Sequence, residues 1–270
     1  MSELPLRLSI FIAVLLAMLM WEQLAAARPS TGNGWRRRST NVLLALFGAG
    51  IMRVLMPAGL AAVAYQAAKH DVGLLRYLPS PAALSWVLGV VILDVAVYFQ
   101  HRLFHRAAVL WRLHAVHHAD SGFDVTTGIR FHPVEILLSS AWKGAIVILL
   151  GIPVGAVVLF EVILSTTALF NHGNVRFSDR IEPWVRWLLV TPTLHRIHHS
   201  LVRDERDCNY GFSVSLWDRL FGTFRGAARA SDRDIGIGLP GIPAGRAGSI
   251  VEMLLLPLQM PQPRTPNDTV

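Results

Sequence analysis

The sequence contains a single cysteine, Cys208, and little charge. Because one thiol has no partner within the chain, the cysteine count excludes an internal disulfide and a cysteine-ligated zinc or iron–sulfur site. Only 16% of the 270 residues are charged, whereas a typical soluble domain carries about 25%. Lysine is almost absent, since Lys69 and Lys143 are the only two. Hydrophobic residues make up 53% of the chain and the mean hydropathy is +0.44, which together indicate an integral membrane protein.

Positive charge is concentrated in one short loop. The formal net charge of +7 is typical either of a nucleic-acid-binding protein or of a protein at an anionic membrane surface. The hydropathy favours the membrane, so we expect no nucleic-acid partner. Residues 28–40 contain four arginines and no acidic residue. Because cytoplasmic loops carry an excess of Lys and Arg, this loop is predicted to face the cytoplasm. If the source is bacterial, the membrane would be the inner membrane.

Apolar stretches long enough to cross a bilayer occur along the first two thirds of the chain. A spanning helix needs about 20 mostly apolar residues, and the candidates are residues 8–27, 41–68, 82–99 and the long block 134–170. Gly151, Pro153 and Gly155 divide that block into a hairpin. Small residues follow the first stretch, as in a secretory signal, but its length favours a retained anchor. We predict an all-α polytopic protein with about four transmembrane helices or hairpin spans, interfacial helices such as the Trp-rich 182–190 segment, and a cytoplasmic helical cap.

Counting spans from the cytoplasmic loop places the clustered histidines on one side of the membrane. Residues 69–81 would lie outside, and the chain would re-enter the cytoplasm at His101. The 134–170 hairpin would leave and return, so that His172 and all later residues would also be cytoplasmic. A single span there would separate the histidines and is the less favoured alternative. We expect three regions: an N-terminal transmembrane anchor at 1–81, a histidine-bearing domain at 82–230, and a Gly/Pro-rich tail at 231–270, partly disordered, most clearly over 262–270.

Histidine is the residue type in excess, with 11 copies in a chain that is poor in charge. Eight of them form three motifs in which residues three or four apart share one helical face, as ligands of one metal ion should. Neutral imidazole is the commonest nitrogen ligand of metals in proteins. His132 and His172 stand alone between the motifs, and His70 is expected to be an ordinary surface residue. The predicted ligands are His101, His105, His114, His117, His118, His132, His172, His195, His198 and His199.

The number of ligands favours a particular metal. Two tetrahedral zinc ions would use about eight ligands at most, whereas nine or ten nitrogens nearly fill two octahedra and leave room for oxygen. Imidazole suits iron as well as zinc, so the ligand type alone does not decide. Carboxylate-bridged di-iron bundles use Glu-x-x-His pairs, and the sequence has none. We therefore favour an all-histidine site for two iron ions, with zinc or another metal as the alternative.

The motifs around these histidines together resemble one known family. Residues 94–105 resemble the first histidine box of the fatty acid hydroxylase/sterol desaturase superfamily, a group of integral membrane di-iron enzymes. The remaining matching elements, which extend to Thr223, are residues 111–118, 131–135, 171–174, 191–200, 207–211 and 217–223. The resemblance implies that residues 82–230 form a catalytic domain that binds two iron ions. It also implies hydroxylation or desaturation, with O2 as co-substrate, of a C–H bond in a sterol, a fatty acyl chain or a related lipid.

The chain has no recognisable electron-carrying module of its own. It lacks a strand–helix unit built on G-x-G-x-x-G, cysteines for an iron–sulfur cluster, and a His-Pro-Gly-Gly haem element. Electrons would therefore come from a separate reductase, ferredoxin or cytochrome. Two other functions stay open: a lipid hydrolase that uses zinc-bound water, and a non-catalytic protein that stores or transports metal. Transport predicts polar residues at the middle of the membrane, whereas the histidines lie at the ends of the spans.

Several polar residues beside the histidines are candidates to orient them. Asp94 has helical spacing to His101 and His105, so its carboxylate is expected to accept a hydrogen bond from a ligand imidazole. His132 could be a ligand or only a hydrogen-bond donor, because the following Pro133 can start a helix. The candidates for this supporting role are Asp94, Tyr98, Glu135 and Asn171.

Charged residues outside the motifs leave more than one interpretation. Lys143 and Glu161 lie within the apolar hairpin, where they could pair, reach the membrane interface, or line a lipid cavity. Arg102, Arg112 and Arg196 lie within the histidine motifs. They could bind an anionic headgroup or an electron carrier, although an exposed arginine needs no special role.

Overall fold

The computed structural model describes residues 3–29, 34–77 and 81–260 and is all-helical over these ranges, with no strand. The predicted disordered segment 262–270 lies outside the described residues. Five helical segments are long and apolar enough to cross a membrane: Leu4–Ala25, Gly34–Lys69, Ala82–Arg106, Pro133–Leu150 and Val154–Asn171. The prediction of an all-α polytopic membrane protein is therefore confirmed.

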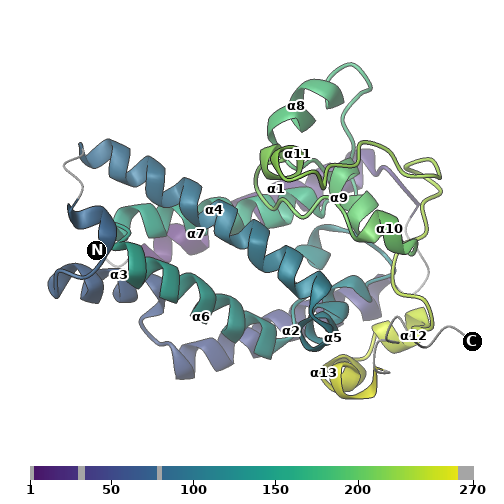
Figure 1. Ribbon diagram of the computed structural model, residues 1–270. Helices are drawn as coiled ribbons and strands as arrows, with labels where there is room; N and C mark the ends of the chain where they lie inside the picture. The colour runs from purple at the N-terminus through teal and green to yellow at the C-terminus, as the bar shows by residue number, and fades with distance from the viewer. Residues whose placement is uncertain (1–2, 30–33, 78–80, 261–270) are drawn as a thin grey trace, which may run out of the picture.

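The long helices form a bundle around α7 (Val154–Asn171). Helices α1 (Glu3–Ala25) and α4 (Ala82–Arg106) both pack against α7, while α2 (Gly34–Leu55) packs against α6 (Pro133–Leu150) (Figure 1). The bundle core includes Leu93, Val147 and Phe160, which are almost fully buried. Most of the outward-facing side chains of α1 and α2 are exposed and apolar, as expected for helices that face lipid.

The second predicted span is not one continuous helix. Helix α2 ends at Leu55, and α3 (Gly59–Lys69) starts after a turn. Pro57 lacks a backbone donor, and Gly59 has a φ of +65°, in the left-handed region that glycine adopts readily. The helix therefore breaks within 41–68, and α3 packs on α6 and α7 beside the hairpin turn.

The predicted break in the 134–170 block is confirmed. Helix α6 ends at Leu150, Gly151 takes a left-handed φ of +66°, and Pro153 precedes the first residue of α7. Gly73, which precedes the short η1 helix (Leu74–Tyr77), approaches this turn closely. A Cβ at that position would lie 2.0 Å from the backbone nitrogen of Gly151. The glycines thus allow the two turns to close the end of the bundle remote from the histidines.

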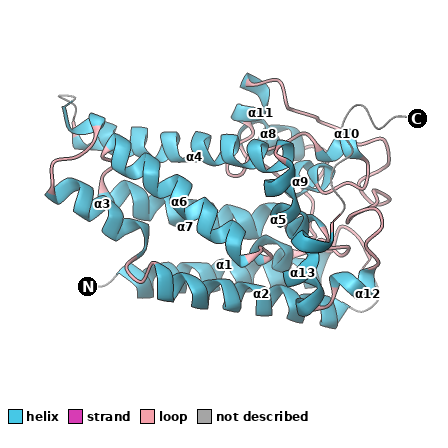
Figure 2. Ribbon diagram, turned by 60° about the horizontal axis from the view of Figure 1, so that its bottom comes forward, coloured by secondary structure: helices cyan, strands magenta, loops and turns pink. Residues whose placement is uncertain are grey.

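Short helices gather at the opposite end of the bundle (Figure 2). Helix α4 extends past the predicted end of its span to Arg106, so the first histidine motif continues the membrane helix. The short elements there are α5 (Ala108–His118), η2 (Val125–Ile129), α8 (Glu182–Leu188), α9 (Pro192–His198), α10 (Arg203–Arg206), α11 (Leu216–Leu220), α12 (Ala244–Ala247) and α13 (Ile250–Gln259). Trp184 and Trp187 of α8 are exposed, as predicted for an interfacial segment.

The C-terminal helix α13 is part of this end of the structure. It packs against α5, and its Met253 and Leu256 are buried beside Leu44 of α2. Its ten residues are too few to cross a membrane, in agreement with the sequence. The helix therefore covers α5, which carries three of the clustered histidines.

Candidate metal centre

Nine histidines converge in two adjacent groups. Within each group, one ring nitrogen of every residue lies within 4.8 Å of those of the others. The rings of His118 and His199, one from each group, stack with centroids 4.3 Å apart. The first histidine group contains His101, His105, His114, His118 and His198, and the second contains His117, His172, His195 and His199.

Helix α5 contributes to both groups because of the spacing of its histidines. Residues four apart lie on one face of a helix, and His114 and His118 both belong to the first group. His117 belongs to the second group and lies between them in sequence. One His-x-x-His-His motif therefore supplies two separate sites, a division that the sequence alone did not indicate.

Helix α9 shows the opposite division. His195 and His199, four residues apart, belong to the second group, while His198 belongs to the first. His101 and His105, one turn apart at the end of α4, both belong to the first group. Each of the two His-x-x-His-His motifs thus contributes to both groups, whereas α4, a candidate membrane-spanning helix, contributes to the first group alone.

Most of these rings are held by an oxygen that accepts a hydrogen bond from Nδ1. When Nδ1 carries the proton, the lone pair of Nε2 is free to bind a metal, and such partners fix the orientation of the ring. The partner of His105 is the most distant. The pairs are His101 with Tyr210 O (2.9 Å), His105 with Asp207 Oδ1 (3.4 Å), His114 with Glu135 Oε1 (2.6 Å), His117 with Arg130 O (3.0 Å), His172 with Ala168 O (2.7 Å) and His198 with Cys208 O (2.7 Å).

The Nε2 atoms face one another in the interior. Those of His101 and His114 lie 3.1 Å apart, and that of His172 lies 3.1 Å from His117 and 2.9 Å from His195. Where both rings donate from Nδ1, such a contact brings two lone pairs together, which is unfavourable without a shared cation. The donor set therefore fits metal ions.

Further ring nitrogens are buried without a partner among the described residues. They are Nε2 of His105 and His198, Nδ1 of His195, and both nitrogens of His118 and His199. A buried polar atom without a hydrogen bond is costly, and metal coordination would satisfy it. Burial lowers the pKa of His198 to about 3 and that of His172 to about 4, so both rings are neutral, as ligands must be.

The structure does not bring His132 into either group. Its Nδ1 accepts a hydrogen bond from the backbone N–H of Val134 at the start of α6. Its Nε2 lies 3.3 Å from the carbonyl oxygen of Leu254 in α13, to which it can donate. Both ring nitrogens are thus engaged in joining α6 to α13. His70, at the end of α3, is exposed, as expected.

Glu135 lies beside the histidines, and its Oε1 accepts a hydrogen bond from His114 Nδ1. The structure places Asp94 elsewhere, because its Oδ2 accepts from Trp217 Nε1 at 2.7 Å rather than from an imidazole. The Tyr98 hydroxyl lies 2.8 Å from Thr223 Oγ1. Both residues therefore join α4 to the 217–223 segment instead of contacting a histidine directly.

Asn171 acts on the loop beside the site. Its side-chain amide donates to the carbonyl oxygen of Phe212 at 2.8 Å. Nearby, Asp218 accepts from the backbone N–H groups of Tyr210 and Gly211, both at 2.7 Å, and burial raises the pKa of Asp218 to about 6. These contacts fix the 207–211 loop, which supplies hydrogen-bond acceptors to three histidines of the first group.

A buried network that the sequence did not reveal holds the second group. Arg130 is fully buried and donates to Val116 O, Asn41 Oδ1 and Ala247 O, while its own carbonyl accepts from His117. Asn41 of α2 in turn donates to Asp120 Oδ2 at 2.8 Å. In the sequence, Arg130 is only an arginine between two motifs, and nothing beside it indicates these contacts.

Asp120 is the acidic centre of this network. Burial alone would raise its pKa, but the guanidinium groups of Arg37 and Arg130 and a hydrogen bond from Thr127 hold it at about 2. Arg37 also pairs with Asp124. Arg37 was predicted to lie in a cytoplasmic loop, but the structure places it in the first turn of α2, buried at the histidine end of the bundle.

Arg196 is not an exposed residue of its motif. Its side chain is fully buried, donates from Nε to Asp232 Oδ1 at 2.7 Å, and lies over the ring of Phe123. Phe123 in turn packs against the rings of His172 and His199. The interpretation as a freely exposed arginine was wrong for Arg196, because burial requires a partner for its charge.

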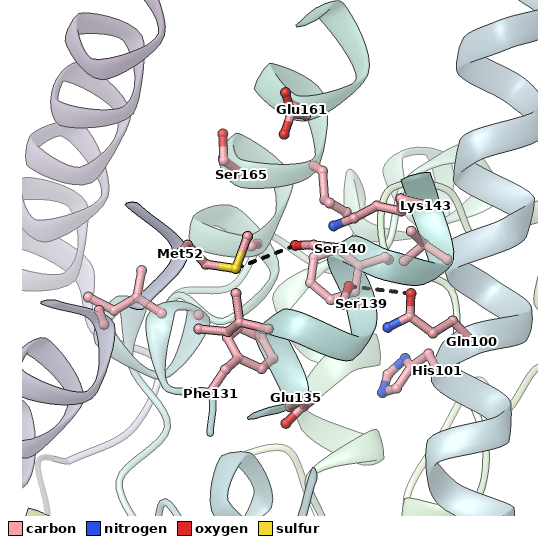
Figure 3. Close-up of a pocket in the computed structure, with 18 of the residues that line it drawn as sticks. Met52, Gln100, His101, Phe131, Glu135, Ser139, Ser140, Lys143, Glu161 and Ser165 are labelled. Atoms are coloured by element: carbon pink, nitrogen blue, oxygen red, sulfur yellow. Dashed lines mark hydrogen bonds between the residues drawn. The ribbon is translucent and has the colours of Figure 1, made fainter. Parts of the chain in front are cut away.

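A cavity of about 550 Å³ reaches the first histidine group. His101, His114 and Glu135 line one end, and Lys143 and Glu161 line the other (Figure 3). Of the three interpretations that the sequence left open for the last two residues, the structure shows that they line a cavity. The residues that line it come mainly from α1, α2, α4, α6 and α7, the helices long and apolar enough to cross a membrane.

The sequence matches one protein family over the region that carries the site. The profile of the fatty acid hydroxylase family matches residues 86–223, just over half of the chain. The ornithine lipid hydroxylase OlsE of Rhizobium tropici is 38% identical over 157 residues, which cover 58% of this chain and 46% of that protein. No solved structure matches the chain.

Relatives of lower sequence identity are also named for the oxidation of lipids. The alkylglycerol monooxygenase of Homo sapiens is 26% identical over 152 residues, which cover 54% of this chain and 32% of that protein. The Delta(7)-sterol 5(6)-desaturase of Eremothecium gossypii is 27% identical over 144 residues, covering 53% of this chain and 38% of that protein. The matched region thus spans less than half of each of these relatives.

Proposed function

The chain belongs to the fatty acid hydroxylase family, and we propose that it hydroxylates or desaturates a C–H bond of a membrane lipid, using two iron ions, O2 and electrons from a separate donor. The names of the relatives include a lipid hydroxylase, a monooxygenase and a desaturase, all oxidoreductases. The proposal assigns the same chemistry to this chain, with iron bound by the two histidine groups.

The observation that carries the proposal is the number and orientation of the imidazoles. Five nitrogens converge in the first group and four in the second, and six of the nine rings have Nδ1 beside an oxygen acceptor. Such a set exceeds the four ligands of a tetrahedral zinc site in one group and leaves positions open for oxygen. When bound, iron would supply the redox chemistry that activates O2.

The protein's own residues would bind and orient the reactants. Glu135 would hold His114 in one tautomer, and the 207–211 loop would do the same for His101 and His198. The cavity would bring the lipid to the edge of the first histidine group. The surrounding apolar side chains would exclude bulk water from the reacting carbon.

We propose further that the histidines face the cytoplasm. The positive-inside rule predicts that residues 28–40 are cytoplasmic, and Arg37 in this segment contacts Asp120 at the histidine end of the bundle. A cytoplasmic reductase, ferredoxin or cytochrome would then have access to the site. An external electron donor is part of the proposal because the sequence has no recognisable electron-carrying module.

The proposal can be tested by metal analysis of the purified full-length protein together with turnover. We expect two irons per chain, and O2 consumption that requires both a reductant and membrane lipid. With 18O2, a hydroxylase product would gain the heavy isotope, whereas a desaturase product would gain a double bond and no label. Bound zinc with O2-independent lipid cleavage would replace the proposal with a hydrolase. Iron without any lipid product would favour a storage protein.

A further inference from the structure

The charges at the end of the cavity remote from the histidines do not balance. Arg7 of α1, Lys143 of α6 and Glu161 of α7 meet there (Figure 3 shows the last two). Among the described residues that line the cavity, only Glu135 and Glu161 are acidic, and Glu135 is engaged by His114 at the other end. Two cations therefore share one carboxylate, which leaves one positive charge uncompensated.

Lys143 is the cation that makes no direct polar contact with the described residues. Arg7 Nη1 lies 3.0 Å from Glu161 Oε2, whereas Lys143 makes no hydrogen bond or ion pair with the described residues. Its ammonium points into the cavity (Figure 3). Both lysine and glutamate here lie on helices that are long and apolar enough to cross a membrane. An ionised side chain in that setting is costly unless an opposite charge is close, and it marks a functional site by default.

The otherwise largely apolar wall between the two ends of the cavity carries several polar side chains. Gln100, Ser139, Ser140 and Ser165 all line it. Ser139 Oγ donates to Gln100 Oε1 at 3.3 Å, and the amide nitrogen of Gln100 has no partner among the described residues. The three serine hydroxyls have acceptors within the protein, but a bare hydrocarbon chain would leave the Gln100 amide nitrogen and the Lys143 ammonium unsatisfied. A ligand that carries polar atoms would satisfy them.

The geometry also limits how such a ligand would lie. Glu135 and Lys143 are eight residues apart on α6, so about 12 Å of helix separates the histidine end from the charged end. A molecule anchored at Lys143 would therefore present to the histidines the atoms that lie roughly this far from its anchoring group.

We propose that Lys143 binds an anionic group, a carboxylate or a phosphate, of the lipid that enters the cavity. The inference rests on the proposed function only in regarding this lipid as the substrate. The anionic group neutralises the excess charge beside Glu161, and its distance from the histidines selects the carbon that reacts. The site would thus accept acidic or zwitterionic lipids and discriminate against uncharged ones of the same length.

The test uses native mass spectrometry of the full-length protein, which counts bound probe molecules without any need for turnover. The probes are dodecanoate and dodecyl phosphate, with dodecan-1-ol as the uncharged equivalent. We expect one anionic probe per chain at concentrations where dodecan-1-ol does not bind, and the tighter of the two anions identifies the preferred group. Equal binding of dodecan-1-ol and dodecanoate would overturn the proposal. Displacement of dodecanoate by an equal concentration of acetate would mean that a free anion, not a lipid, occupies the site.

Variants of the two lysines provide a matched comparison. Lys143→Met should weaken dodecanoate binding by about tenfold or more, because a charge-assisted hydrogen bond is lost, and Lys143→Arg should retain it. Lys69→Met is the control, since Lys69 is exposed on α3 and does not line this cavity. Wild-type affinity in Lys143→Met would contradict the proposal.

A second variant keeps the test valid if Lys143→Met does not fold. Glu161→Gln removes the only nearby negative charge, so it should strengthen dodecanoate binding, and weaker binding would contradict the proposal. Iron content and O2 consumption are measured on the same samples. Absence of iron or of turnover in the wild-type protein would refute the proposed function. The binding of dodecanoate tests the role of Lys143 independently of that result.

Discussion

The guanidinium of Arg37 and the carboxylate of Asp120 form a buried ion pair, with Nη1 2.8 Å from Oδ2. Arg37 lies near the start of α2, and Asp120 follows the second histidine motif by two residues. Asp120 also accepts from Asn41 and Thr127. The pair therefore joins the N-terminal membrane helices to the segment that positions His117 and His118.

Removal of one partner of this pair should destabilise the protein strongly. Arg37→Gln removes a cation that pairs with both Asp120 and Asp124, and the loss of one partner of a buried ion pair typically costs about 3–5 kcal/mol. The control is Arg36→Gln, because Arg36 is exposed and makes no ion pair with the described residues; it should change stability by about 0.5 kcal/mol or less. Thermal unfolding of the detergent-purified variants measures the difference. Equal melting temperatures for Arg37→Gln and Arg36→Gln would show that the pair is not structurally important.

Substitution of Glu135 should weaken the first histidine group without unfolding the bundle. Glu135→Ala removes the oxygen that accepts from His114 Nδ1 at 2.6 Å, and loss of such a partner lowers metal affinity or activity by about 10–100-fold. Glu135→Gln retains an amide oxygen and should lose less. Glu252→Ala on α13 is the control, since among the described residues its carboxylate pairs with Arg246 and with no histidine. Metal titration of the apo-protein measures the affinity, and an unchanged value in Glu135→Ala would contradict the assigned role.

Accessibility of introduced cysteines can test which side the histidines face. In a Cys208→Ser background, Leu74→Cys reports on the loop at the end of the bundle remote from the histidines, and Trp184→Cys reports on exposed α8 at the histidine end. A membrane-impermeant maleimide should label Leu74→Cys in intact cells. It should label Trp184→Cys only after the membrane is permeabilised. The reverse pattern would place the histidines outside and would exclude a cytoplasmic electron donor.

The parts of the structure that depend on local sequence were predictable. The apolar runs indicated the spanning helices, and Gly151 with Pro153 indicated the hairpin turn, because each signal lies within a few neighbouring residues. The break before α3 was missed although Pro57 and Gly59 are visible in the sequence, since hydropathy averaged over residues 41–68 conceals it. The region boundaries at 81 and 230 stay predictions, and in the structure α1, α2 and α13 all contribute to the histidine end.

The parts that depend on tertiary packing were not predictable. Spacing placed His114, His117 and His118 on one side of α5, but the direction from which α9 and His172 approach decides which histidine group each ring joins. Arg130 acts through contacts to residues far away in the sequence, such as Asn41 and Ala247. No periodicity within one helix records such contacts.

His132 and His172, the two isolated histidines of the predicted ligand set, should behave differently. His172 belongs to the second histidine group. Under the proposed function it is an iron ligand, so His172→Ala should lower iron content and abolish turnover while the protein still inserts in the membrane. His132 instead caps α6 and contacts Leu254. We expect His132→Ala to retain iron but to lose about 1 kcal/mol of stability with the cap.

The substitution His132→Asn separates the capping role from metal binding. Asparagine is a favourable N-cap residue, so His132→Asn should recover much of the melting temperature lost in His132→Ala, although asparagine is a poor substitute for an imidazole ligand. His70→Ala, at an exposed position on the remote end of the bundle, is the control for histidine loss as such. Iron content, melting temperature and turnover are compared across the four variants. If His132→Ala and His132→Asn both lost iron as His172→Ala does, His132 would be a ligand after all, and the two groups would have to rearrange on metal binding to reach it.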